Sequence, residues 1–255
     1  MSASPKGSEA IVLAEVPSFR DAIVKRSLKN VIADRIAGLI ASGLVQVGDT
    51  LPSERQLASS LNVSRETTRG AILLLASRGI LEISHGARTR VVRSDVGEIT
   101  IGFGQARAIN AYDIDSVHDA RLLIERRVVA DAARRIDDAA LAALDGLLAV
   151  QKEAFDDPVG FLICDREFHA TIYRASGNAL LADFAADLYT YMMEYRRTAV
   201  ARPGAIATSY ADHAAIVAAL RDHDPDAAVA AFAVHTDRIY QTTQSAMKDG
   251  RQDRS

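Results

Sequence analysis

Residues 51–92 read LPSERQLASSLNVSRETTRGAILLLASRGILEISHGARTRVV, and this stretch carries the start signals of two short helices. Ser53, followed three residues later by Gln56, has the spacing of a capping box and predicts the start of the first helix. Ser64 is a residue type that caps a helix start, and Gly79 is a type that ends one. The sequence therefore predicts a short helix, a tight turn and a second helix.

Each of these two helices has an apolar side and a polar side. The apolar side of the first helix is formed by Leu57, Ala58 and Leu61. The apolar side of the second is formed by Thr68, Ala71, Ile72 and Leu75. The start of the second helix exposes Arg65, Glu66, Thr67 and Arg69. This arrangement predicts a helix-turn-helix, in which the start of the second helix reaches base edges in the major groove of DNA.

The flanking segments extend this unit on both sides. Apolar residues at helical spacing predict a helix from Ser27 to Ser42, which Gly43 ends. After the second helix, Ile80–Ser84 and Thr89–Val92 are joined through His85-Gly86-Ala87-Arg88 and are typical of a β-hairpin wing. The sequence therefore predicts a winged helix-turn-helix.

Composition narrows the class of protein. The chain has 255 residues, of which 49% are hydrophobic, enough for one large domain or two ordinary ones. A single cysteine excludes a disulfide framework and a Cys-based zinc finger. No apolar run approaches the ~18 residues of a membrane span, and the start of the chain does not resemble a signal peptide. We therefore expect a cytoplasmic protein with no membrane partner.

Charge is distributed unevenly along the chain. The formal net charge is −3, but residues 1–93 hold 13 Lys and Arg against 8 Asp and Glu, whereas the remainder holds 17 against 25. A basic segment adds affinity for phosphates, and an acidic body is repelled by the duplex. The asymmetry alone could arise by chance, but it agrees with a DNA-binding unit at the N-terminal end.

The rest of the chain predicts an all-α domain. We expect a disordered N-terminus over residues 1–20, the winged helix over 21–93, a glycine-containing linker over 94–112, a helical domain over 113–246 and a flexible tail over 247–255. Within the helical domain, short connections favour an antiparallel bundle of six segments. Their expected bounds are 114–136, 138–154, 158–176, 179–199, 205–222 and 225–246.

Three histidines and an aspartate of this domain form a candidate metal site. Asp165 and His169 are spaced i, i+4 and so project from one helix face. His213 and His235 each lie on the apolar face of a later helix. Imidazole suits Zn, Ni, Cu or Fe, and a carboxylate extends the range towards Mn. The alternative to a metal site is that each histidine is a hydrogen-bonded core residue and that Asp165 pairs with His169.

Arginines of the same domain are candidates for binding an anion. Arg121 and Glu125 are also spaced i, i+4. They could form a surface ion pair, or Arg121 could face the bundle interior as a fork for a carboxylate. Arg196 and Arg197 offer the same option. By contrast, we expect His118 and His223 to lie at the surface.

Two groups of residues resemble a known family. Residues 51–91 resemble the winged helix of the GntR transcriptional regulators, and DREFHATIYRASGNALL with DHAAIVAALRDHDPDAAVAAFAVHTDR resembles the FCD effector domain of their FadR subfamily. The resemblance extends over nearly all of Ser27–Tyr240. It implies a mainly α fold in which a winged helix-turn-helix precedes an antiparallel helical bundle, and six helices favour the smaller, VanR-like version of that bundle.

The resemblance also implies roles for particular residues. Those that match DNA contacts are Arg55, Ser64, Arg65, Thr67, Arg69 and, at the wing tip, His85 and Gly86. Glu66 stands where several relatives carry a small or hydroxyl residue, so base preference at that position is left open. The matches to metal ligands are Asp165, His169, His213 and His235, and Arg121 matches a position near the effector pocket. Arg197 is our second candidate for effector binding.

The function these features favour is a metabolite-responsive transcriptional regulator, most simply a repressor. Its expected partners are double-stranded operator DNA, a second copy of the chain and a small carboxylate effector, such as a hydroxy acid, a sugar acid or a dicarboxylate. The expected cofactor is a divalent metal, zinc before nickel or manganese. Two alternatives remain: a metal-dependent helical-bundle enzyme, and a DNA-binding protein that responds to no ligand.

Overall fold

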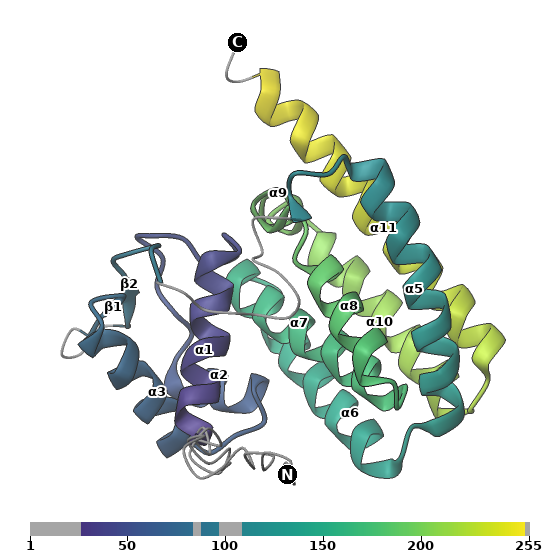
Figure 1. Cartoon of the computed structure of the whole chain (residues 1–255), viewed down its shortest axis with the longest axis horizontal. Helices are drawn as coiled ribbons and strands as arrows, with labels where there is room; N and C mark the ends of the chain where they lie inside the picture. The colour runs from purple at the N-terminus through teal and green to yellow at the C-terminus, as the bar shows by residue number, and fades with distance from the viewer. Residues whose placement is uncertain (1–26, 84–87, 97–108, 253–255) are drawn as a thin grey trace, which may run out of the picture.

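The computed structural model of the chain describes residues 27–83, 88–96 and 109–252, which form two parts lying side by side (Figure 1). The first part contains helices α1 (Leu28–Ala41), α2 (Glu54–Ser60) and α3 (Arg65–Ser77) with strands β1 (Leu81–Glu82) and β2 (Arg90–Val91). The second is entirely helical. The mainly α class and the order of the two units are therefore confirmed.

The helix-turn-helix forms as its local signals predict. The Ser53 hydroxyl accepts from the Gln56 backbone N–H while the Gln56 side chain accepts from the Ser53 N–H, which completes a capping box. The Ser64 side chain caps α3 by accepting from Thr67 N–H at 3.0 Å. Between the two helices Asn62 adopts a left-handed backbone with φ of 51°, a conformation that asparagine tolerates. The predicted inner residues of both helices are buried.

The wing is a short antiparallel hairpin. Leu81 pairs with Val91, and Glu82 pairs with Arg90. The turn before α2 joins the same hairpin, because Leu51 N–H donates to Thr89 O at 2.8 Å. The predicted tip residues His85 and Gly86 lie outside the described residues.

The helical part comprises α5 (Ile114–Arg135), α6 (Asp138–Glu153), α7 (Pro158–Ala175), α8 (Ala179–Tyr189), α9 (Met193–Val200), α10 (Ala205–Arg221) and α11 (Pro225–Gln252). The segment predicted as one helix over 179–199 is two helices, because the chain breaks at Thr190–Met192. Within 109–252 there are thus seven helices instead of six, so the helix count does not support the preference for the smaller version of the domain.

The C-terminal helix is longer than predicted. It continues to Gln252, past the expected end at residue 246. Arg202 Nη2 lies 2.5 Å from Asp249 Oδ2 and ties the extension to the chain before α10. The disorder predicted for residues 1–20 and most of the predicted linker lie outside the described residues. None of the described helices is long and apolar enough to cross a lipid bilayer.

Candidate metal centre

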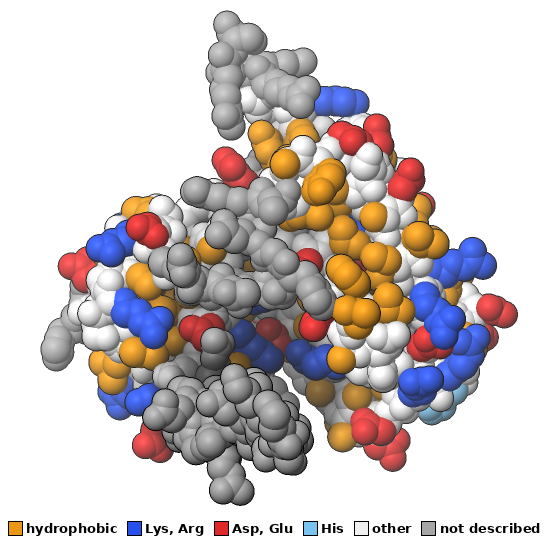
Figure 2. Space-filling model, in the orientation of Figure 1, with side chains coloured by type: hydrophobic (Ala, Val, Ile, Leu, Met, Phe, Trp, Pro, Cys, Tyr) orange, Lys and Arg blue, Asp and Glu red, His pale blue; other side chains and the backbone are white. Residues whose placement is uncertain are grey.

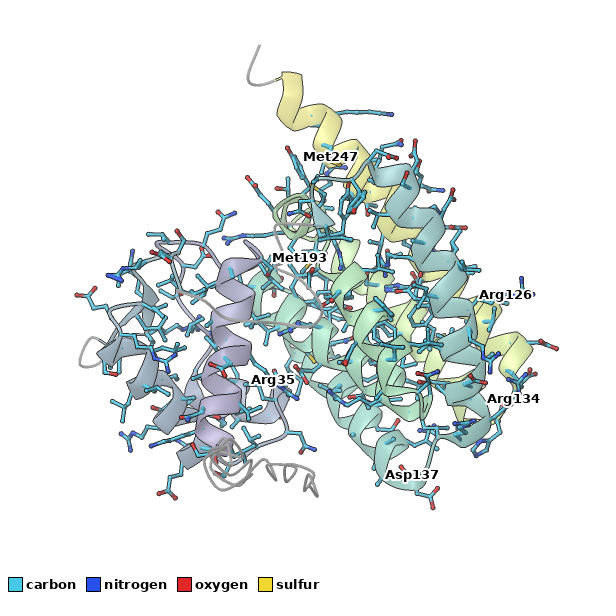
Figure 3. The ribbon with its side chains drawn as sticks, in the orientation of Figure 1. Arg35, Arg126, Arg134, Asp137, Met193 and Met247 are labelled. Carbon is cyan, nitrogen blue, oxygen red and sulfur yellow. The ribbon has the colours of Figure 1, made fainter. Side chains whose placement is uncertain are left out.

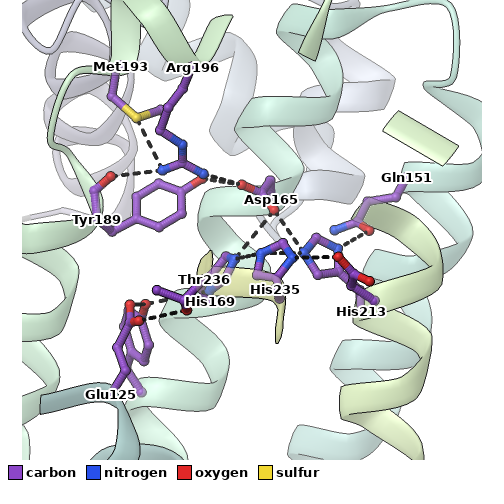
Figure 4. Close-up of polar contacts among 12 residues, drawn as sticks. Glu125, Gln151, Asp165, His169, Tyr189, Met193, Arg196, His213, His235 and Thr236 are labelled. Atoms are coloured by element: carbon purple, nitrogen blue, oxygen red, sulfur yellow. Dashed lines mark hydrogen bonds and ion pairs between the residues drawn. The ribbon is translucent and has the colours of Figure 1, made fainter. Parts of the chain in front are cut away.

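Four side chains from three helices meet in the interior of the helical part (Figure 4). Helix α7 supplies Asp165 and His169, α10 supplies His213, and α11 supplies His235. All four are buried, with at most 2% of their surface exposed. The i, i+4 spacing on α7 turns the first two toward the same neighbours, whereas the other two come together only through the packing of α10 against α11.

The distances within this cluster fit a metal ion. His235 Nε2 lies 3.2 Å from His169 Nε2 and 3.2 Å from His213 Nε2. Asp165 Oδ1 lies 3.5 Å from His169 Nε2 and 3.2 Å from His213 Nε2. An ion bound at about 2.0–2.1 Å holds tetrahedral ligand atoms roughly 3.3–3.4 Å apart. Four of the six separations among these atoms therefore match neighbouring ligands of one ion, and all six are within 4.8 Å.

Contacts on the outer side of each ring favour the same orientation. His213 Nδ1 lies 2.8 Å from Gln151 Oε1, and an acceptor there favours the tautomer with the proton on Nδ1. The Nδ1 of His169 faces the Tyr173 hydroxyl at 3.5 Å, and that of His235 lies 3.5 Å from Asp212 Oδ2 without forming a hydrogen bond to any described residue. Protonation at Nδ1 leaves the Nε2 lone pairs pointing inward, the arrangement that metal-binding histidines require.

The two oxygens of Asp165 have different surroundings. Oδ2 accepts from Arg196 Nη2 at 3.1 Å and from the Tyr189 hydroxyl. Oδ1 faces the histidines and makes no hydrogen bond within the described part of the chain. A buried carboxylate oxygen without a donor is costly unless a cation compensates it. This orphaned atom is therefore independent evidence that the residues present fit a metal.

Three members of the cluster have pKa values shifted in the direction that favours metal binding. Burial together with the neighbouring His213 lowers the pKa of His235 to about 3, and burial also lowers the pKa of His169. Burial would raise the pKa of Asp165, but contacts with His169 and His213 hold it well below its usual range. At neutral pH His169 and His235 are therefore neutral and Asp165 is a carboxylate, and these are the forms that bind a metal ion.

A second polar cluster lies beside the first. Glu125 Oε1 accepts from Arg121 Nη2 at 2.9 Å and from the Tyr173 hydroxyl at 2.6 Å, and Thr236 Oγ1 donates to Glu125 Oε2 at 3.0 Å. The prediction of a surface ion pair is wrong, because Arg121 and Glu125 are only 6% and 2% exposed. Arg121 does face the interior, but its guanidinium already holds an internal carboxylate.

A cavity of about 310 Å³ reaches the metal cluster from the side of α9 and α10. Asp165 and His235 belong to its lining. Its other polar side chains are Arg196, Arg202, Arg238, Thr208, Ser209, Thr242 and Thr243. The Thr243 hydroxyl is buried and has no hydrogen-bond partner among the described residues. The cavity therefore offers hydroxyl and guanidinium groups next to the cluster.

The candidate effector residue Arg197 is placed elsewhere. Its guanidinium holds both carboxylate oxygens of Asp49 in the winged helix, with Nη2 2.8 Å from Oδ1. Adjacent residues on a helix point about 100° apart. Arg196 thus lines the cavity beside the cluster, and Arg197 does not.

Three residues that contact the metal cluster were not predicted from the sequence, and only one of them, Tyr173, has a sequence signal. Tyr173 follows His169 by four residues and Asp165 by eight, so it shares their helix face. Gln151 and Asp212 support His213 and His235 from other helices, and no sequence pattern marks them. Of the histidines predicted at the surface, His223 is exposed and bonds Ala133 O through Nδ1 at 2.8 Å. His118 is half-buried and stacks on Tyr240.

The candidate DNA-contacting side chains lie on the outside of the first part. Exposed residues are Arg55, Ser64, Arg65, Glu66 and Arg69, and Thr67 is partly exposed. The Ser64 hydroxyl also serves as the helix cap, so it is not free to act solely as a DNA donor. Arg69 Nε lies 3.7 Å from Glu54 Oε1, whereas Arg65 makes no ion pair with any described residue.

Comparison with known proteins gives consistent results over both parts. The family described as bacterial regulatory proteins, gntR family, matches residues 28–91, and the FCD domain matches residues 116–238. The HTH-type transcriptional repressor NanR of Citrobacter rodentium is 30% identical over 228 residues, covering 86% of each chain. The protein of the same name from Edwardsiella tarda is 29% identical over 230 residues, covering 87% of each.

A solved structure, E. coli McbR/YncC, shares the fold with a TM-score of 0.50 at 22% identity, covering 84% of this chain and 98% of that one. The curated relatives are transcriptional repressors, which excludes the metalloenzyme alternative.

Proposed function

The chain belongs to the gntR family of bacterial regulatory proteins and carries an FCD domain, and from that membership we propose a metal-dependent repressor that responds to a small carboxylate. In this proposal the winged helix binds operator DNA, and the helical part binds the metal and the effector. The observation that carries it is the inward convergence of Asp165 Oδ1 and three imidazole Nε2 atoms.

We propose that Asp165, His169, His213 and His235 hold the ion, with zinc ahead of nickel or manganese. Three imidazoles and one carboxylate at these distances suit zinc, and nickel and manganese accept the same donor atoms. When bound, a divalent ion supplies a Lewis-acidic position for an effector oxygen. A divalent ion together with Arg196 exceeds the single charge of Asp165, so the loaded centre is net positive and favours an anion.

The effector in this proposal occupies the cavity of about 310 Å³ beside Asp165 and His235. Its carboxylate faces the net positive centre, and its remaining polar groups face hydroxyls such as that of Thr243, which lacks a partner among the described residues. Hydroxy acids, sugar acids and dicarboxylates all combine a carboxylate with further oxygen atoms. Arg121, which is held by Glu125, does not line this cavity.

A thermal-shift screen tests the effector. Binding at ~100 times Kd adds about 2.7 kcal/mol of stability, which at roughly 2–4 °C per kcal/mol raises Tm by ~5–10 °C. We expect zinc-loaded protein to show such a shift with at least one hydroxy acid, sugar acid or dicarboxylate, and a smaller shift after chelation. If no carboxylate moves Tm of the zinc-loaded protein, the protein is a DNA-binding regulator without this response.

We infer a homodimer from the DNA-binding role, because one winged helix contacts too few base pairs for specificity. Hydrophobic side chains gather on the face formed by α5 and α8 (Figure 2). Leu123 is 75% exposed, Leu180 51% and Phe184 39%. Exposed apolar patches on soluble proteins mark interaction sites. We propose that this face packs against the same face of a second copy.

Negative charge introduced on the face formed by α5 and α8 should separate the two subunits. We expect the double substitution Leu123→Asp and Phe184→Asp to convert a dimer to a monomer, because each buried carboxylate would lack a partner. Sedimentation equilibrium at micromolar concentration measures the mass. Leu73→Asp is the matched control, since Leu73 is 55% exposed but lies on α3. A double variant that remains dimeric would place the interface elsewhere.

A further inference from the structure

We propose that helix α9 couples the metal centre to the winged helix through two adjacent arginines, Arg196 and Arg197. This inference rests on the proposed function, because it names the route by which that metal centre regulates DNA binding. Arg196 contacts a metal-ligand candidate, and Arg197 contacts the other part of the molecule. A shift of this short helix would therefore change the contact with the metal cluster and the contact with the winged helix together.

Arg196 is held in the interior by several contacts. It is 5% exposed. Its Nη2 donates to Asp165 Oδ2 at 3.1 Å, and its Nη1 donates to Tyr189 O at 2.9 Å (Figure 4). The guanidinium also lies 4.3 Å from the centre of the Tyr189 ring. Arg196 thus orients the carboxylate so that Oδ1 faces the histidines, and it fixes α9 to the end of α8.

Arg197 binds the winged helix at Asp49, which lies in a turn that is hydrogen-bonded to the wing. Its two terminal nitrogens hold the two carboxylate oxygens of Asp49, a bidentate pair. Asp49 Oδ2 also accepts from Gln46 N–H at 2.7 Å, and Gly48 N–H donates to Val91 O at 2.8 Å. The contact therefore reaches strand β2 of the wing through the backbone of one short turn.

The break before α9 suits a moving element. Met192 has φ of 50°, a left-handed conformation that is strained for a non-glycine residue. Its N–H donates to Asn110 Oδ1 at 2.9 Å, and the Tyr191 hydroxyl donates to Tyr112 O at 2.9 Å. The described end of the segment between the two parts is thus attached to this same break.

A second ion pair connects the two parts close to the metal ligands. Arg35 lies on the side of α1 that faces the helical part, and its Nη1 lies 3.0 Å from Glu167 Oε2 (Figure 3). Glu167 lies two residues from Asp165 and two from His169 on α7. Glu167 is therefore two residues from two ligand candidates, and Arg197 is next to Arg196, which contacts Asp165. Each ion pair between the two parts thus lies close in sequence to the metal cluster.

Coupling between two sites is reciprocal, so docking of the winged helix must affect metal affinity if the metal affects docking. The docked arrangement, with Arg197 on Asp49, is the one in which Arg196 leaves Asp165 Oδ1 free for an ion. Loss of docking should therefore weaken metal binding, even though Asp49 belongs to the other part of the molecule and touches none of the four ligands.

Zn²⁺ titration of the full chain against a chromophoric chelator tests this route without DNA or effector. We expect Asp49→Ala and Arg197→Ala each to weaken Zn²⁺ binding by about threefold to tenfold. The double variant should be no weaker than either single one, because both remove the same contact. Asp49→Glu should restore most of the affinity, since it keeps the carboxylate.

The matched control breaks an ion pair that does not join the two parts. Arg221 Nη2 lies 2.7 Å from Asp145 Oδ1, between α10 and α6, and Asp145→Ala should leave Zn²⁺ affinity unchanged. Unchanged or tighter Zn²⁺ binding in Asp49→Ala overturns the coupling and leaves the proposed function standing. A wild-type chain that binds none of Zn²⁺, Ni²⁺ and Mn²⁺ overturns the proposed function itself.

Discussion

Alanine in place of both His213 and His235 is expected to reduce bound metal from about one ion per chain to a trace. The two rings supply two of four ligand atoms, and the remaining Asp165 and His169 come from one helix. Structural sites for zinc use four protein ligands, and catalytic sites use three, so two are not enough to retain an ion through dialysis. Elemental analysis of protein purified with zinc and dialysed against a weak chelator gives the stoichiometry.

The control for this experiment is His223→Ala, which removes a histidine that is exposed on the turn before α11. It should retain the wild-type stoichiometry. Zinc should also raise Tm of the wild type and of this control, but not of the double variant. Circular dichroism establishes that the double variant is folded, and stoichiometric metal in a folded double variant would show that the ion is bound elsewhere.

Local signals account for what was correctly predicted in the winged helix. The capping residues Ser53 and Ser64 act on backbone N–H groups within three positions, so their effect can be read from adjacent residues. Gly79 ends α3 with φ of 70°, a conformation that favours glycine. The helix break at Met192 carries no such signal, because neither glycine nor proline stands there and tertiary contacts hold the strained backbone.

The metal cluster was predictable because each member lies on a buried helix face. The sequence does not indicate how α9 is rotated about its axis after the break at Thr190–Met192. This rotation decides that Arg196, and not Arg197, points inward. The burial of Arg121 and Glu125 was open to prediction. Both lie on a stripe with Val117 and Val128, at spacings of four, four and three residues, and that stripe is the buried side of α5.

Arg65→Ala is expected to remove operator specificity while leaving the protein folded. Arg65 is exposed at the first turn of α3 and makes no ion pair with any described residue, so its guanidinium is available to a guanine. A bidentate contact contributes about 1–3 kcal/mol. A dimer would lose this contact at both half-sites, so affinity for the operator should fall at least ~30-fold, towards that for unrelated DNA.

Fluorescence anisotropy with the native promoter fragment and with an unrelated duplex measures both affinities. Arg78→Ala is the matched control, because Arg78 is equally exposed but caps the other end of α3. It should weaken binding to both duplexes by a similar small factor, as loss of a distant positive charge would. If Arg69→Ala removes specificity and Arg65→Ala does not, Arg69 is the base-reading residue. In that case its contact with Glu54, at 3.7 Å, must open when DNA binds.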